Sequence, residues 1–341
     1  MDSFAQLGRE EAIRRLYEGT PWHRDGAPFF EPKARAVVRG ASLLRSEGID
    51  FDLSYFPLKH LGHKCITEVT GELCARMAVP RTLNVEVGVS AKLDFPQVQD
   101  LWSGMTDAAR SYGYAGVALD LVPSLNGLTI AVSACGECAG LTDKRRSPLQ
   151  SKDLICVSGP LGAAYLGQRL LEREKKLFSD KGEGAFAGRG DGGKTTLDNY
   201  KMLVGAYLKP ELNAGVVGAL EDAGIYPGYG AFIFRGLADA VLRLASTSGL
   251  GVKIYADKIP FEGGSFQLGQ ELDIDPVSAA MNGGEDCRLM YVVPILSLER
   301  FRRDFQTFDI IGHMAKAEAG ACLVTPEGAE LPITAQGWES E

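Results

Sequence analysis

One stretch of the sequence, residues 188–195, matches the phosphate-binding spacing G-x-x-x-x-G-K-[ST]. In proteins that use this motif, a buried strand leads into it, so that backbone N–H groups and a helix N-terminus converge on the phosphate. Here residues 178–184 precede the motif and are polar and glycine-rich. Because the chain contains 41 glycines, a chance match is the better explanation. We therefore expect residues 179–195 to form a loop.

Cys135 and Cys138 have the spacing C-x-x-C, which occurs in structural zinc sites. Such a site needs about four ligands, usually two such pairs, and the sequence has no second pair. His60 and His63 are three residues apart, but no cluster of Cys or Asp accompanies them. We expect two half-buried thiols at a strand end and two histidines on a helix surface.

The composition is that of an ordinary globular protein: 45% of the 341 residues are hydrophobic, 23% are charged, and the formal net charge is −8. A pI near 5.2 argues against a general nucleic-acid binder, because neutralising phosphates requires a surplus of Lys and Arg. No apolar run approaches the length of a membrane span. The seven cysteines are an odd number for a secreted disulfide framework, and the N-terminus is acidic where a signal peptide is basic. We expect a cytoplasmic protein that binds neither nucleic acid nor membrane.

Hydrophobic periodicity predicts strands alternating with helices, the pattern of an α/β protein. In the first half we expect helices at 3–18, 58–78 and 98–112, and strands at 34–44, 83–90, 116–121 and 128–135. In the second half we expect helices at 163–176, 197–208, 211–223 and 236–248, and strands at 153–158, 252–256 and 289–293. The length favours two domains, and polar residues 141–148 separate the halves. We expect domains at residues 1–150 and 151–341.

Several stretches, in order along the chain, resemble motifs of the thiamine-monophosphate kinases. Residues 47–64 are similar to their Glu-Gly-x-His-Phe … Leu-Gly-x-Lys stretch, and residues 158–162 to their Ser-Gly-Asp-Leu-Gly turn. The match to their Gly-Gly-Glu-Asp motif consists of Gly283, Gly284, Glu285 and Asp286. Trp338 corresponds to the tryptophan of their closing Gly-Trp. The resemblance spans nearly the whole chain.

The resemblance implies a two-domain aminoimidazole ribonucleotide synthetase-like fold, α/β (α+β), in a homodimer whose N-terminal domain sheets pair across the dimer. It also implies that ATP and several Mg²⁺ ions occupy a cleft lined by aspartates, and that the γ-phosphoryl group moves to thiamine monophosphate. Aspartates suit that reaction because Mg²⁺ prefers hard oxygen ligands and neutralises charge on the polyphosphate. By resemblance, Gly283–Asp286 and Trp338 belong to the substrate site, with Trp338 near the thiamine moiety.

Three acids remain where the family has its aspartate motifs. Asp25 keeps the second acid of the Gly-Asp-Asp motif, Glu72 replaces the aspartate of the Ser-Asp motif, and Asp120 keeps that of the Gly-Gly-Asp motif. These three are the candidate metal ligands and candidate contacts of the nucleotide phosphates.

Other aspartates of the family are missing. Arg24 replaces the first acid of the Gly-Asp-Asp motif, and residue 43 is Leu where the Thr-Thr-Asp motif ends. Phe232 and Arg235 replace both aspartates of Asp-x-Ser-Asp-Gly-Leu. Arginine repels Mg²⁺ but binds phosphate bidentately without a metal, so Arg24 and Arg235 are candidate phosphate-binding residues.

Three functions remain open on these residues. The first is a thiamine-monophosphate kinase with reduced or unusual metal use. The second is a non-catalytic relative that binds a phosphorylated ligand or a protein partner through Arg24 and Arg235. The third is a different phosphotransferase on the same fold. We favour the kinase family with impaired catalysis.

Overall fold

The computed structural model describes residues 7–23, 30–138, 144–181 and 196–335, and it confirms a mixed α/β architecture with two sheets. The chain divides into two compact units. The first unit comprises Met1–Lys144 with Leu212–Ala219, and the second comprises Arg145–Glu211 with Leu220–Glu341. In the described ranges, no helix combines the length and the apolar character needed to cross a bilayer.

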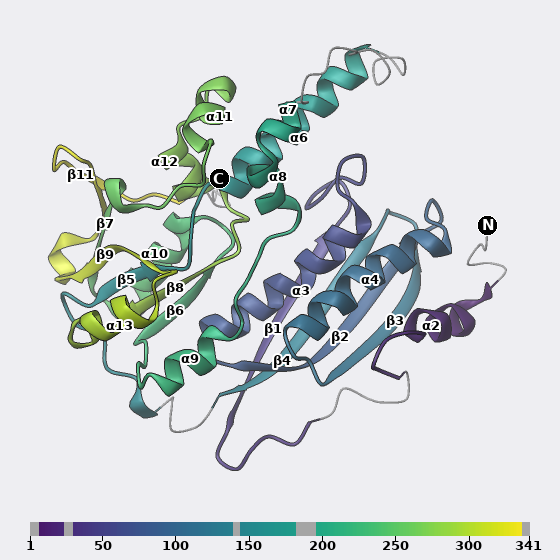
Figure 1. Cartoon of the computed structure of the whole chain (residues 1–341), viewed down its shortest axis with the longest axis horizontal. Helices are drawn as coiled ribbons and strands as arrows, with labels where there is room; N and C mark the ends of the chain where they lie inside the picture. Colours follow the sequence, from purple (N-terminus) through teal and green to yellow (C-terminus); the bar gives the residue numbers. More distant parts are fainter. Residues whose placement is uncertain (1–6, 24–29, 139–143, 182–195, 336–341) are drawn as a thin grey trace. The chain divides into compact units, whose positions relative to one another are not determined.

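The first unit is built on a four-stranded sheet of order β1–β4–β2–β3, in which β2 and β3 are parallel and the other pairs antiparallel. Its elements are α2 (Arg9–Tyr17), β1 (Val37–Ser46), α3 (Leu58–Ala75), β2 (Val79–Ser90), α4 (Phe95–Ser111), β3 (Gly116–Ser124) and β4 (Thr129–Cys138). Helices α3 and α4 lie across one face of this sheet (Figure 1). Helix α4 begins directly after Asp94, whose side chain forms a capping box with Gln97.

Alternation along the strands assigns each residue of this sheet to one of its two faces. The row that faces the helices consists of Leu43, Val132, Val85 and Leu119. The neighbouring row, on the opposite face, consists of Leu44, Ala131, Glu86 and Asp120. Leu44 is 62% exposed, so this second face is open to solvent at the β1 edge of the sheet.

The second unit is built on a seven-stranded sheet of order β11–β10–β7–β9–β5–β8–β6. Its strands are β5 (Leu154–Val157), β6 (Tyr229–Ile233), β7 (Gly251–Tyr255), β8 (Arg288–Val293), β9 (Asp309–Ala315), β10 (Ala321–Val324) and β11 (Glu330–Pro332). Its α-helices are α6 (Ala163–Lys181), α7 (Thr196–Asn199), α8 (Lys201–Leu208), α10 (Leu237–Ser248), α11 (Ser265–Leu272), α12 (Pro276–Ser278) and α13 (Leu298–Asp304). A π-helix, η3 (Ala279–Gly283), and three 3₁₀ helices, η2 (Ala256–Lys258), η4 (Ile295–Ser297) and η5 (Ala317–Ala319), complete it. Helix α9 (Val216–Asp222) spans the division between the units.

The main core of the second unit lies between its sheet and α10. Val241 and Leu244 of α10 pack with Ile254 and Met290 of the sheet, and all four side chains are fully buried. A separate cluster joins α6, α8 and α11. Loops follow β5 and β6 at the ends of these strands.

Most predicted elements are confirmed, with three differences. The helix expected at 211–223 begins only at Val216, because the Asn213 side chain accepts a hydrogen bond from the Gly215 N–H at 3.1 Å and forms a turn instead. Helix α6 continues to Lys181, into the expected loop, whose residues 182–195 lie outside the described residues. Strands β6 and β9–β11 and helices α11 and α13 were not predicted.

Candidate functional site

Three loops of the second unit meet at one end of its sheet. Strands β5 and β6 both pair antiparallel with β8, so the ends of β5 and β6 lie beside the beginning of β8. The loops are Ser158–Gly162 after β5, Phe234–Gly236 after β6 and Gly283–Cys287 before β8. The two motifs at 158–162 and 283–286, far apart in sequence, are therefore neighbours.

Asp286 joins two of these loops. Its carboxylate accepts hydrogen bonds from the Gly162 N–H at 2.7 Å and the Ala164 N–H at 3.1 Å, and the residue is 3% exposed. The first N–H groups of a helix have no partner within the helix, and a carboxylate also interacts favourably with the helix dipole. Asp286 therefore caps α6 from a distant part of the chain, and both of its oxygens are already engaged by backbone groups.

Glycines allow the other loops to approach closely. Gly284 has φ +81°, and a Cβ there would lie 2.8 Å from the Phe234 carbonyl oxygen. A Cβ on Gly236 would lie 2.4 Å from the Met281 carbonyl oxygen. The Glu285 N–H donates to the Phe234 carbonyl at 2.5 Å, so the loop that carries Arg235 is fixed against the Gly-Gly-Glu-Asp loop.

Arg235 is the exposed cation of this loop cluster. Among the residues that the structure describes, it has no ion-pair or hydrogen-bond partner for its side chain, whereas Glu285 beside it is half-buried. Phe232, by contrast, is 2% exposed inside β6 and its ring stacks on that of Phe234 at 6.5 Å. Of the two replaced aspartate positions, only 235 therefore presents its side chain to solvent.

In the first unit, Asp120 lies on β3 and is paired with Arg9 of α2. Arg9 also donates through Nε to the Leu121 carbonyl at 2.9 Å and through Nη1 to Glu10 at 2.5 Å. The Arg9 and Asp120 side chains are 47% and 46% exposed. The Asp120 carboxylate is thus already accompanied by a positive charge from the same chain.

Glu72, on α3, also has an arginine partner. Its carboxylate lies 3.4 Å from the guanidinium of Arg76, which donates to the Gly40 carbonyl of β1 at 2.6 Å. Glu72 therefore lies in the helix layer at the β1 edge, whereas Asp120 lies on the opposite face of the sheet, on the β3 edge. Strands are about 4.8 Å apart, so three strand spacings separate β1 from β3 by about 14 Å. The chain does not bring these two acids together.

The described candidate acids are not gathered into one metal-binding cluster. Mg²⁺ is usually held by one or two carboxylates together with substrate phosphates and water. Within the described ranges, no three side chains of His, Cys, Asp or Glu are placed to hold one ion. Arg24, Asp25 and Trp338 lie outside the described residues, as does the 188–195 motif.

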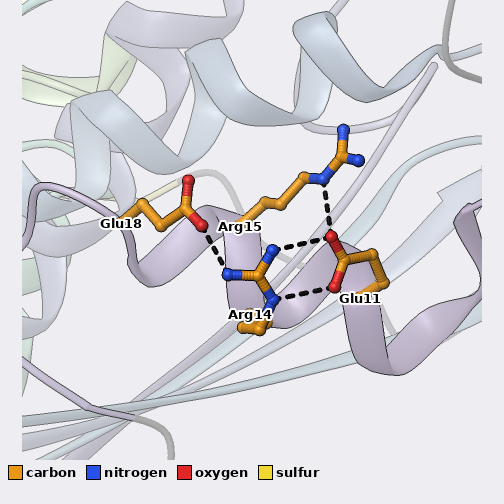
Figure 2. A network of polar contacts seen from close by, with 4 residues as sticks. All are labelled: Glu11, Arg14, Arg15 and Glu18. Carbon is orange, nitrogen blue, oxygen red and sulfur yellow. Dashed lines mark hydrogen bonds and ion pairs between the residues drawn. The ribbon is translucent and has the colours of Figure 1, made fainter.

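Helix α2, which supplies Arg9, carries a second set of ion pairs (Figure 2). Glu11 accepts from Arg14 at 2.7 Å and from Arg15 at 2.8 Å, and Arg14 also reaches Glu18 at 2.6 Å. Hydrogen bonds from Arg14 and then Arg15 lower the pKa of the Glu11 carboxyl to about 2.

The structure also describes the cysteines and histidines that the sequence analysis considered as metal ligands. Cys135 is half-buried on β4, as expected, whereas Cys138 is buried, and neither forms a disulfide. His60 and His63 are half-buried on α3 rather than exposed, and His63 lies beside Tyr112 with 6.4 Å between ring centroids. Sequence reasoning missed Arg9, whose only signal was its place in an amphipathic helix.

Proteins of known identity resemble this chain over most of its length. It is 23% identical over 295 residues to the thiamine-monophosphate kinase of Aquifex aeolicus, covering 86% of this chain and 87% of the relative. It is 25% identical over 291 residues to the thiamine-monophosphate kinase of Synechococcus elongatus, covering 84% and 82%. No model of a protein family matches the sequence.

Over most of its length this chain is similar to the thiamine-monophosphate kinases, at identities of 23–25%. A relative with another name is similar as well: a putative hydrogenase expression/formation protein of Methanocaldococcus jannaschii is 23% identical over 289 residues, covering 82% of this chain and 78% of the relative.

Solved structures share the fold of this chain. Thiamine-monophosphate kinase from Stenotrophomonas maltophilia gives a TM-score of 0.71 at 19% identity, covering 86% of this chain and 87% of that one. AaThiL complexed with AMPPCP and TMP gives 0.69 at 20% identity, covering 97% of each chain. HypE of E. coli, a hydrogenase maturation protein, also gives 0.69, at 16% identity over 97% and 96% of the chains. The two-domain fold implied by the resemblance is therefore confirmed, and it is shared by proteins with different names.

Proposed function

We propose that this chain is a thiamine-monophosphate kinase-like protein in which metal-dependent phosphoryl transfer is impaired. The observation that carries the proposal is the arginine beside each remaining acid that the structure describes: Arg9 at Asp120 and Arg76 at Glu72. A metal ion at either carboxylate must displace or sit beside a guanidinium. Together with the aspartates missing at Leu43 and Arg235, these pairs support weaker metal binding than the family reaction requires.

The test is formation of thiamine diphosphate from thiamine monophosphate and Mg-ATP, followed by mass spectrometry against a blank without protein. We expect no product above the blank, or slow turnover that demands high Mg²⁺, from folded protein at high concentration. Ordinary turnover at modest Mg²⁺ would overturn the proposal of impaired catalysis.

A non-catalytic role in binding a phosphorylated ligand or a protein partner is the alternative, and the exposure of Arg235 favours it. An arginine without an ion-pair partner in the described ranges is free to bind a phosphate bidentately. We expect this protein to bind thiamine monophosphate more tightly than thiamine in calorimetry without Mg²⁺ or ATP. The double variant R24A/R235A should remove that difference, whereas R303A, an exposed arginine on α13, should keep it. Equal affinity for the two ligands in the unaltered protein would argue against a phosphate site.

We further propose a homodimer formed through the open face of the first unit's sheet. Val38, Leu44 and Val122 lie on this face and are 47%, 62% and 51% exposed, an unusual set for a sheet that faces water. Light scattering after size exclusion should give twice the 36.7 kDa chain mass. L44K should give the monomer, whereas L296K, at an exposed position of η4, should leave the dimer intact.

A further inference from the structure

The first unit contains a pocket at the carboxyl ends of β2 and β3, the two strands of its sheet that run parallel. Its volume is about 470 Å³, and its lining combines the last residues of both strands with Ala91 and Leu93, which precede α4, and with Arg9 of α2. Pockets of roughly 300–1,000 Å³ hold small molecules, and the carboxyl ends of parallel strands are a common place for them. The position and the size of this cavity are therefore those of a ligand site.

The walls of the pocket are mainly apolar. Aliphatic side chains come from both strands and from the turns that follow them: Val89, Leu93, Leu121, Val122 and Leu125. Val122 and Leu125 are 51% and 102% exposed, so a ligand that covers them removes apolar surface from water. The walls therefore favour a ligand with an apolar body.

Two neighbouring serines of the lining supply hydrogen-bond donors. Ser90 and Ser124 are the last residue pair of the β2–β3 ladder. Each hydroxyl oxygen accepts from a backbone N–H two residues later, that of Lys92 or of Asn126, at 3.3 Å in both cases. Among the residues that the structure describes, neither hydroxyl has an acceptor for its own proton. Since adjacent strands are about 4.8 Å apart, one ligand oxygen can accept from both hydroxyls.

The pocket offers no unpaired charge to a ligand. Arg9 is the charged residue of the described lining, and its guanidinium pairs with Asp120 and Glu10 and donates through Nε to the Leu121 carbonyl at 2.9 Å. A charged ligand would lose water without gaining a partner of opposite charge that is not already engaged. The site therefore favours a neutral ligand.

We propose that this pocket binds a small neutral molecule that has an apolar body and a carbonyl oxygen, the chemistry of an aryl or alkyl ketone, ester or amide. The apolar walls hold the body, and the hydroxyls of Ser90 and Ser124 donate to the oxygen. The proposal goes beyond the proposed function, because it requires no phosphate, no metal ion and no residue of the second unit.

Acetophenone, ethylbenzene and benzoate test this assignment, because they share a ring and differ in the oxygen acceptor and in charge. Saturation-transfer NMR and calorimetry use the full chain without nucleotide or Mg²⁺. Acetophenone should bind most tightly, ethylbenzene about three- to tenfold more weakly because it lacks the acceptor, and benzoate most weakly of the three. Equal affinity for acetophenone and ethylbenzene, or tighter binding of benzoate, would overturn the proposal.

Variants locate the site. S90A/S124A removes both hydroxyls and keeps the apolar walls, so it should bind acetophenone only as weakly as ethylbenzene, whose own affinity should not change. S124A alone, at the more exposed of the two positions, should already narrow the difference between these ligands. S103A, at a serine of α4 outside the lining, should leave both affinities unaltered.

A competition experiment separates this pocket from a nucleotide site. ATP should not displace acetophenone from the unaltered protein, and displacement would overturn the proposal, because the cavity would then belong to a nucleotide site. Unchanged acetophenone affinity in folded S90A/S124A would also overturn it, whatever the result of the thiamine monophosphate assays.

Discussion

The guanidinium of Arg9 pairs with the carboxylate of Asp120, across 111 positions of the sequence. Asp120 is one of the acids that remain at the aspartate motifs of the thiamine-monophosphate kinases, and its partner comes from helix α2. Both side chains are about half exposed, so the pair adds little to stability, on the order of 0–1 kcal/mol. Its main effect is to place a positive charge beside the Asp120 carboxylate.

Replacing Arg9 should increase the affinity of Asp120 for divalent cations. R9A removes the positive charge that accompanies the carboxylate, so Mn²⁺ binding followed by electron paramagnetic resonance should tighten severalfold. The stability change should stay within about 1 kcal/mol, because the pair is exposed.

R14A is the matched control, because Arg14 lies on the same helix but pairs with Glu11 and Glu18. Mn²⁺ affinity that rises equally in R14A would show a general charge effect. Unchanged affinity in R9A would mean that the ion pair does not limit metal binding.

The Glu11 carboxyl should titrate near pH 2, because hydrogen bonds from Arg14 and Arg15 lower its pKa from 4.5 to about 2. A folded-state pKa below the unfolded value means that the contribution of these bonds is fully present above about pH 4.5. It is lost as the pH falls towards 2. Carbon-13 NMR of the carboxyl group measures this titration directly. In R14A the midpoint should move up towards 4.5, and an ordinary midpoint in the unaltered protein would show that the network of Figure 2 does not persist in solution.

Removing the Asp286 carboxylate should destabilise the second unit. D286A leaves the Gly162 and Ala164 N–H groups without their acceptor, which should lower the free energy of unfolding by about 2–4 kcal/mol. D286N keeps one acceptor oxygen, so its free energy of unfolding should fall by less than that of D286A. Urea unfolding followed by circular dichroism gives both values, and D257A, an exposed acid on η2, should change stability by less than about 0.5 kcal/mol. Equal losses in D286A and D257A would contradict a capping role.

A side chain at position 284 should strain the loop cluster. Gly284 combines φ +81° with ψ −176°, a region open essentially to glycine, and its Cβ would approach the Phe234 carbonyl to 2.8 Å. G284A should therefore cost about 1–3 kcal/mol of stability. G263A is the control, because nothing lies within 4 Å of a Cβ there and its φ is ordinary. Chemical denaturation that gives equal stability for the two variants would contradict the described loop geometry.

Periodicity predicted the long elements well and the short ones poorly. Helices α3 and α4 and strands β2 and β4 bury one regular face, and that regularity is visible in the sequence. Strands β10 and β11 have four and three residues, too few to establish a period.

The sequence identified residues of the candidate site but not the contacts that they make. The motifs at 158–162 and 283–286 were both identified from the sequence. The partners of Asp286 are backbone N–H groups, however, and because nearly every residue has such a group, the sequence does not reveal which ones Asp286 binds. Arg9 is one of several arginines in an amphipathic helix, and only the packing of α2 against β3 selects it as the partner of Asp120.

The Asp286 cap also has a consequence for synthesis on the ribosome. Helix α6 and strand β5 emerge early, but the carboxylate that caps α6 follows Gly162 by 124 residues, and both neighbours of β5 in the sheet come from beyond residue 287. At elongation rates of about 5–20 residues per second, these segments wait for about 6–25 s without their partners. During that time the residues of β5 that are buried in the folded unit lack the strands that cover them, and such exposed apolar surface favours aggregation.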